Sequence, residues 1–165
     1  MPASESWRIP PAWSHTPPVP ASDRHAWPDL RALFRRDRDS ARSQLVQRLA
    51  PIHDAEDIRV TIVFDGRGDE LVVERPSQQP TFSVVYTPSA LTADDVIEQA
   101  VGSSASPAHC IVATDDRAER QTVSATGATA ITADDLAAWI RRAESRQSAS
   151  VRELRAANAR AWKHP

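Results

Sequence analysis

The sequence predicts an α/β protein, a layered sandwich around a mainly parallel central sheet, with a long helix at the C-terminal end. Short runs rich in β-branched residues alternate with longer runs whose apolar residues have helical spacing. The run VTIVF (60–64) is apolar almost throughout, which is typical of a strand buried on both faces of a parallel sheet. Strands that interleave with helices in this way indicate a layered α/β architecture.

The first ordered elements are expected to be two helices. Pro28 fits the start of a helix, because its fixed backbone angle suits the first turn. A second helix is predicted over residues 38–50, where Leu45 and Leu49 lie one turn apart on a common face. Pro51 is expected to end this helix, because proline cannot donate the next backbone hydrogen bond.

Strands and helices then alternate along the remainder of the chain. Three strands are expected first, at 58–65, 70–74 and 82–87. After them come a helix at 92–102, a strand at 110–116, a helix at 117–125, a strand at 128–131 and a long helix from 133. The polar connection RPSQQP (75–80) separates the second and third strands.

Composition divides the chain into three parts: a proline-rich segment (1–24), a domain (25–143) and a basic helical tail (144–165). Proline density excludes regular structure from the first part, which is expected to be extended and largely disordered. The net charge is −2, yet the stretch from residue 141 onward has a balance of +5, so the preceding 140 residues carry −7. A basic tail on an acidic body suggests a polyanionic partner, and a solvated helical face is the alternative.

Several classes of protein are excluded by what the sequence lacks. Its apolar runs are too short to span a bilayer, and no apolar signal-peptide core opens the chain, so a soluble cytoplasmic protein is expected. Cys110 is the single cysteine and reads as a buried thiol. With four glycines and no glycine-rich phosphate loop, a bound nucleotide cofactor is not expected.

Acidic residues gather at the expected carboxyl ends of the strands, where ligands bind in open parallel sheets. Asp65 ends one strand, Asp115 and Asp116 end another, and Asp94 with Asp95 begins the helix before it. Crowded carboxylates raise one another's pKa values unless a cation offsets them, and Mg²⁺ or Mn²⁺ prefers such oxygen ligands. Metal-assisted attack of water on a phosphodiester is the chemistry indicated, with turn and capping roles as the alternative.

The letters TADD occur twice, at 92–95 and at 132–135. A threonine followed three residues later by an acid is a helix-capping pattern, and acids in a first helical turn lie at the positive end of the helix dipole. Capping alone explains either copy, so the surroundings of each must decide whether one of them also carries chemistry.

The order HAWPDL, VTIVFDG, TADDVIE and VATDDRAERQ resembles the YacP-like NYN domains, over about residues 25–143. That resemblance implies a PIN-like three-layer fold and an endoribonuclease-like activity on RNA, in some members on the ribosome. It selects Asp94 from the first TADD, Asp116 from TDDR and Asp65 from the strand end as catalytic and metal-binding acids. Asp95 and Asp115 become auxiliary metal ligands, and the second TADD becomes a cap.

The chain departs from this family at its first strand, which in members ends in D-G-Y-N a few residues before the segment that matches HAW. Here TPPVPASDR (16–24) stands in its place, without the strand, its glycine or its acid. We expect residues 1–24 not to be the native beginning of the domain but the product of a wrong start or a shifted reading frame. A search for the missing motif in the other frames of the upstream DNA tests this.

The leading hypothesis is therefore an endoribonuclease-like domain that depends on Mg²⁺ or Mn²⁺ and acts on RNA. The alternative is a non-catalytic RNA- or ribosome-binding module that has lost one acid, and a purely structural partner-binding domain is a third possibility. In either RNA-binding case, arginines are expected to contact phosphates without reading sequence. The expected contacts are Arg117, Arg120, Arg141, Arg142, Arg146, Arg152 and Arg155, with Arg160 at the end of the same helix.

Overall fold

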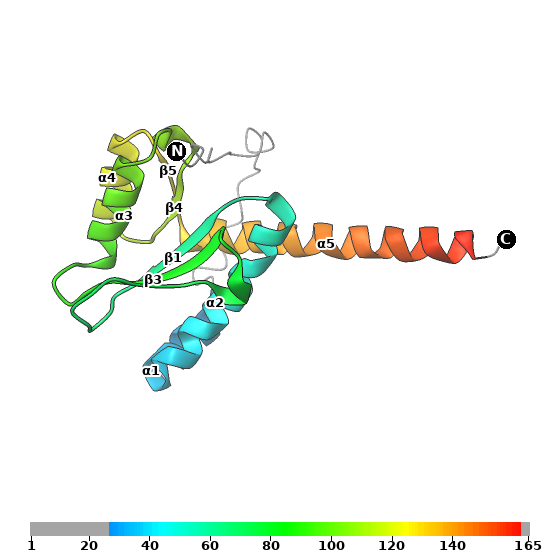
Figure 1. Cartoon of the computed structure of the whole chain (residues 1–165), viewed down its shortest axis with the longest axis horizontal. Helices are drawn as coiled ribbons and strands as arrows, with labels where there is room; N and C mark the ends of the chain where they lie inside the picture. The colour runs from blue at the N-terminus through cyan, green and yellow to red at the C-terminus, as the bar shows by residue number, and fades with distance from the viewer. Residues whose placement is uncertain (1–26, 163–165) are drawn as a thin grey trace.

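A computed structural model describes residues 27–162 of the protein, so the expectations for residues 1–24 lie outside the described part (Figure 1). The architecture is mixed α/β with parallel strands and a long C-terminal helix, as predicted. The elements in order are α1 (Pro28–Arg36), α2 (Arg38–Glu56), β1 (Val60–Phe64), β2 (Val72–Glu74), the short 3-10 helix η2 (Pro76–Gln78), β3 (Phe82–Tyr86), α3 (Ala93–Gly102), the 3-10 helix η3 (Pro107–His109), β4 (Ile111–Ala113), α4 (Arg117–Ala125), β5 (Thr129–Ile131) and α5 (Ala133–Ala161).

Helix α2 is longer than expected, because Pro51 does not end it. The helix continues through the proline to Glu56 and stops at Asp57, which has a left-handed backbone with φ 51°. Proline removes one backbone donor, but Leu49 and Ile52 on either side of it are both buried in the main core. Tertiary packing thus outweighs the local cost, and the prediction of a stop at Pro51 is wrong.

The strands form two sheets instead of one. In the first sheet β1 and β3 are parallel and β2 is antiparallel to β3, in the order β1-β3-β2. In the second sheet β4 and β5 are parallel. Figure 1 shows β5, β4, β1 and β3 in that order down the view. The single central sheet expected from the alternation of elements is thus divided between β4 and β1.

Two apolar clusters flank the strands. The larger joins α2, β1, β3, β5 and α5, and includes Ile62, Val84 and Trp139. The smaller lies among α3, β4 and α4, with Val101 and Val123 at its centre. Strands of both sheets therefore pack against α2 and α5 in the larger cluster, although no backbone ladder joins the sheets among residues 27–162.

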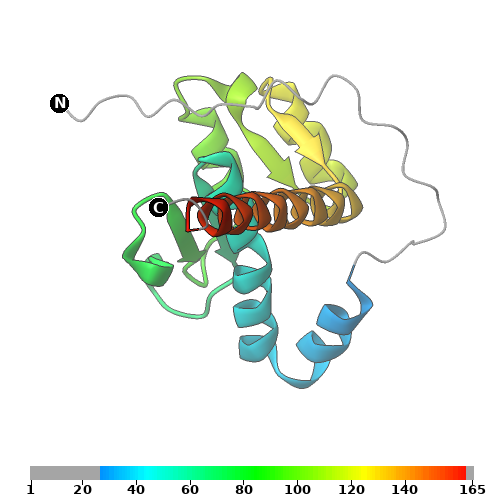
Figure 2. The same cartoon turned by 90° about the vertical axis from the view of Figure 1, so that its right-hand side faces the viewer.

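Helix α5 has two halves with different surroundings. Its first turns are buried in the larger cluster as far as Ala143, which has no exposed surface. Beyond that point the helix projects from the body of the domain, and Figure 2, a view from that end, shows it crossing in front of α2. Leu154 is 64% exposed there. No helix within residues 27–162 is both long enough and apolar enough to cross a membrane.

Candidate functional site at the carboxyl ends of the strands

Asp65 directly follows the last residue of β1, and its side chain binds the start of α3. Its Oδ1 accepts a hydrogen bond of 2.8 Å from the main-chain N–H of Ala93. The next residue, Gly66, lies so close to Thr87 that a Cβ atom would stand 2.1 Å from the Thr87 carbonyl oxygen. Glycine is therefore required after Asp65, and the sequence FDG fixes where the chain turns away from β1.

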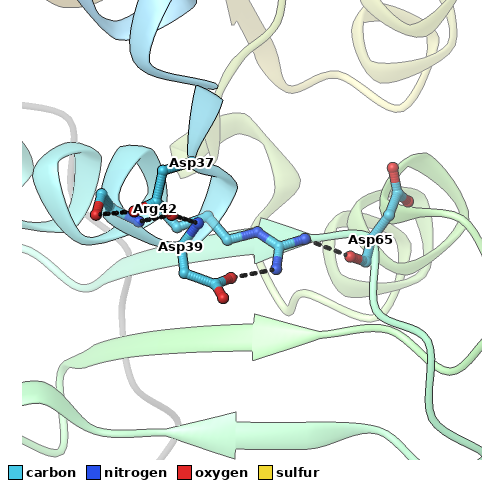
Figure 3. Close-up of polar contacts among 5 residues, drawn as sticks. Asp37, Asp39, Arg42 and Asp65 are labelled. Atoms are coloured by element: carbon cyan, nitrogen blue, oxygen red, sulfur yellow. Dashed lines mark hydrogen bonds and ion pairs between the residues drawn. The ribbon is translucent and has the colours of Figure 1, made fainter. Parts of the chain in front are cut away.

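Arg42 of α2 holds the same strand end from the opposite side (Figure 3). Its Nη2 donates to the main-chain oxygen of Asp65 at 2.8 Å, and its Nη1 lies 3.5 Å from Asp39 Oδ1. The guanidinium also stacks over two rings, 5.3 Å from the centroid of Phe64 and 5.5 Å from that of Tyr86. A fixed positive charge thus lies beside Asp65, a feature that sequence reasoning missed because 23 residues separate the two.

The second pair of strand-end acids also binds helix starts. Asp115 Oδ1 accepts from the main-chain N–H of Ala133 at 2.9 Å, at the start of α5. Asp116 is the N-cap of α4, and its Oδ1 accepts from the main-chain N–H groups of Ala118 at 2.7 Å and Glu119 at 3.0 Å. The turn and capping chemistry that was the alternative for these acids is present.

The two TADD motifs form the same capping box. At the first, Asp95 N–H donates to Thr92 Oγ1 at 3.1 Å, and Thr92 N–H donates to Asp95 Oδ2 at 2.9 Å. At the second, the corresponding bonds between Asp135 and Thr132 are 3.2 Å and 3.0 Å long. The donors of Thr92, first the main-chain N–H and then the hydroxyl, hold the pKa of Asp95 below its ordinary value. The second copy is a cap, as predicted, and the first copy forms the same cap.

Glu119, on the first turn of α4, is the acid that sequence reasoning missed. It is only 6% exposed, and its Oε1 is buried without a hydrogen-bond partner. Burial raises the pKa of Glu119; a hydrogen bond with Thr114 lowers it, while neighbouring Asp94 and then Asp116 raise it again. Asp94 is within hydrogen-bonding reach of Glu119, so these two side chains form a carboxyl pair between α3 and α4.

The donor chemistry of this corner suits a divalent cation, but the described residues do not surround one. Asp94, Asp116 and Glu119 offer hard oxygen ligands, and the orphaned Oε1 of Glu119 faces no protein donor. Within residues 27–162, however, no three His, Cys, Asp or Glu side chains are already grouped closely enough to hold a metal ion. The structure thus brings Asp94, Asp116 and Glu119 near one another, while Asp65 and Asp115 are turned to helix starts.

The arginines expected to bind RNA lie on two helices, and some of them also contact other parts of the chain. Arg120 of α4 donates to the Thr114 carbonyl oxygen at 3.4 Å. Arg146 of α5 forms an ion pair with Glu56, whose side chain also accepts from the indole N–H of Trp139. Exposed on the same helices are Arg117 at the start of α4, and Arg141, Arg142, Arg152, Arg155 and Arg160 along α5.

A mixed α/β domain with acids at the carboxyl ends of parallel strands fits the class of PIN-like nuclease relatives. The sequence profile of the YacP-like NYN domain matches residues 24–164. "Uncharacterized protein YacP" of Bacillus subtilis (strain 168) is 31% identical over 134 residues, which cover 78% of this chain and 76% of that protein. The chain belongs to the YacP-like NYN domain family, which is related to nucleases.

Solved structures agree with this membership. A crystal structure of a single-substitution mutant of Rae1 (YacP) from Bacillus subtilis matches with a TM-score of 0.61 at 26% identity, over 79% of this chain and 77% of that one. A second crystal structure of Rae1 (YacP) gives a TM-score of 0.55 at 25% identity, over 74% and 70% of the two chains. The predicted family and fold class are therefore confirmed.

Proposed function

We propose that the chain is an endoribonuclease-like NYN domain that acts on RNA with Mg²⁺ or Mn²⁺. The observation that supports it best is the buried carboxyl group of Glu119, which lies beside the exposed Asp94 and Asp116. A buried carboxyl oxygen without a hydrogen-bond partner, such as Glu119 Oε1, costs about 1–3 kcal/mol of free energy that a purely structural site would avoid. Perturbed acids at the carboxyl ends of parallel strands are a common sign of a functional site.

Asp94, Asp116 and Glu119 would hold the cation, which would supply a polarised phosphate oxygen and an activated water when bound. The chain's own groups divide the other tasks. Asp65 sets the start of α3, and with it Asp94, by accepting from Ala93 N–H. Burial raises the pKa of Glu119, and the neighbouring carboxyl groups of Asp94 and Asp116 raise it as well; the positive charge of a bound cation would oppose this effect.

The capping acids take a supporting part. Asp95 and Asp115, expected as auxiliary ligands, hold the ends of α3 and α5 through the bonds described above. They would keep the helix starts in place around the Asp94–Glu119 pair and would not contact the phosphate. Arg42, fixed beside Asp65, adds positive charge at this strand end.

Incubation of the protein with structured RNA and with ribosome-bound RNA in the presence of Mn²⁺ tests the proposal. Cleavage should occur with the natural sequence and should disappear when Asp94→Asn and Asp116→Asn are combined. Asp134→Asn is the matched control, since Asp134 has the same place in the second TADD motif. Cleavage that persists in the double variant would show that the site is elsewhere.

Binding of the RNA backbone is assigned to the projecting half of α5, with the ribosome as one candidate context. Arg152 and Arg155 are exposed there, and Arg160 follows in the last turn. Each phosphate contact that is removed should lower the slope of log affinity against log salt by roughly 1. Arg152→Ala and Arg155→Ala together should therefore weaken binding to all RNA sequences alike, and an unchanged slope would contradict the assignment.

A non-catalytic RNA- or ribosome-binding module is the second candidate, and one observation favours it. Asp65, Asp115 and Asp116 are all occupied as helix-start acceptors, and no group of metal ligands is preassembled within residues 27–162. Calorimetric titration with Mn²⁺ separates the two candidates. Stoichiometric binding that is lost in Asp94→Asn supports the nuclease, whereas RNA binding without Mn²⁺ binding supports the module.

A further inference from the structure

The outer edge of β1 has no strand neighbour among residues 27–162. In a parallel ladder alternate residues direct their N–H and C=O groups to the same side. Val60 N–H donates to Thr81 at 2.8 Å, and the Phe64 oxygen accepts from Thr87 N–H at 3.0 Å, so these residues face β3. The residues between them, Thr61 and Val63, therefore direct their N–H and C=O groups to the open edge.

Strand β4 also has an open edge among the described residues. The Cys110 oxygen accepts from Thr129 N–H at 2.9 Å, and Thr114 N–H donates to Ile131 at 3.0 Å, so both ends of the strand are bonded toward β5. By alternation, Ile111 and Ala113 direct their N–H and C=O groups away from β5. Strands β1 and β4 thus each present an open edge of their sheet. We call the space between these two edges the strand slot.

The two open edges lie toward each other. Asp65 at the end of β1 binds the start of α3, and Asp94 there lies beside Glu119 of α4, the helix that directly follows β4. This succession of contacts brings the second sheet beside β1, with β4 as the strand on the β1 side. Figure 1 shows the same order, with β4 and β1 adjacent in the view. It also gives β1 and β4 the same direction, because both carboxyl ends meet at these helix starts.

Both faces of the strand slot border apolar side chains. On one side is the larger core, to which Ile62 of β1 and Ile111 of β4 contribute. On the other side is the smaller core, with Val112 of β4 and Val101 of α3. The almost wholly apolar run of β1 is typical of a central strand, yet Thr61 is exposed and Val63 only half-buried. The apolar residues along this edge are therefore of the kind found in a central strand, with a neighbour on each side.

We propose that the strand slot accepts one extended, proline-free and apolar strand from another polypeptide, parallel to β1 and β4. Such a strand would hydrogen-bond to Thr61 and Val63 on one side and to Ile111 and Ala113 on the other, uniting the two sheets. Apolar residues on both of its faces would meet the two cores. A second copy of this chain is not the expected donor, because each of its described strands already pairs with a neighbour.

Amide hydrogen exchange on the ¹⁵N-labelled full chain tests the proposal. The probe is a synthetic peptide with the sequence of residues 59–66, RVTIVFDG, flanked by lysines for solubility. Binding should be saturable and should slow exchange at Thr61, Val63, Ile111 and Ala113 by about tenfold or more. Exchange at Val60, which already bonds to β3, should not change. The matched control peptide carries proline in place of its central isoleucine and should not bind, because it lacks the ladder donor.

Four outcomes would overturn the proposal, and none depends on RNA cleavage. These are absence of binding, equal binding of the proline peptide, and slower exchange confined to β2 at the far edge of its sheet. The fourth is slow hydrogen exchange at the amides of Thr61, Val63, Ile111 and Ala113 when no peptide has been added. If that protection depends on protein concentration, a second copy fills the slot, and if it does not, the chain fills the slot itself.

Discussion

The two TADD helix starts are almost identical in their capping bonds and differ in what surrounds them. In each, a strand-end aspartate binds the first helical N–H, Asp65 to Ala93 at 2.8 Å and Asp115 to Ala133 at 2.9 Å. The two motifs differ in the surroundings of their first aspartate, which is Asp94 in one and Asp134 in the other. Asp94 lies beside the buried Glu119, whereas the described contacts of the second copy are those of a cap. The same motif thus serves as a cap in both places and gains chemistry only from its neighbours.

The helices behind the two caps differ as well. Helix α5 buries Trp139 and Ile140 in the larger core soon after its start. Helix α3 is 10 residues long, and Val101 near its end is its buried residue. The second copy therefore anchors the fold, while the first holds a short helix at the edge of the candidate site.

The largest expected effect concerns this anchoring role. Trp139→Ala should lower the free energy of unfolding by about 3–5 kcal/mol, because it empties a large buried volume and leaves Glu56 without its indole donor. Val101→Ala on α3 should lower it by roughly 2 kcal/mol or less. Denaturant titration measures both, and equal losses would show that the two helices anchor the fold alike.

Glu119→Gln should raise stability while it removes activity. The folded state raises the pKa of Glu119, so its contribution is complete below the ordinary value of 4.5 and declines as the pH rises toward the folded-state pKa. The amide variant carries no charge to desolvate and can donate to Asp94, so at pH 7 it should be more stable by about 1 kcal/mol. Unfolding measured across this pH range checks the sign, and a loss of stability at pH 7 would mean that Glu119 is a structural acid.

The caps themselves should be equal in strength. Thr92→Ala and Thr132→Ala should each lower the free energy of unfolding by about 1 kcal/mol, since each removes one side-chain acceptor from a first helical turn. The difference between the two losses should be under about 0.5 kcal/mol. A much larger loss at Thr132 would show that cap strength scales with the length of the helix that follows.

Much of the fold could be predicted because it depends on local chemistry. Caps at Thr92 and Thr132, the start at Pro28 and the order of strands and helices all follow from residue type and spacing. Pro51 was misjudged because the packing of Ile52 against distant elements cannot be read locally. The division into two sheets likewise depends on which strands pair with each other. The alternation of apolar and polar residues along a strand does not determine its pairing partner.

Two of the acids of the candidate site could be named from the sequence, but their arrangement could not. Asp116 was expected from a strand end and Asp94 from a helix start, both selected by the family resemblance, and the structure brings both near Glu119. A signal for Glu119 existed, because it lies one helical turn after Asp116, but an acid there also suits the first turn of any helix. Arg42 gave no signal, since its contact with Asp65 arises only when α2 packs across β1.

The comparison of the two motifs is tested most directly by one paired measurement, the rate of RNA cleavage with Mn²⁺ for Asp94→Asn and for Asp134→Asn. Both substitutions remove one charge from the same position of the same capping motif, so their effects on helix stability should match. Our account predicts that Asp94→Asn lowers the rate by at least about 100-fold and that Asp134→Asn leaves it within about twofold. Equal rates for the two variants, whether both high or both low, would contradict it.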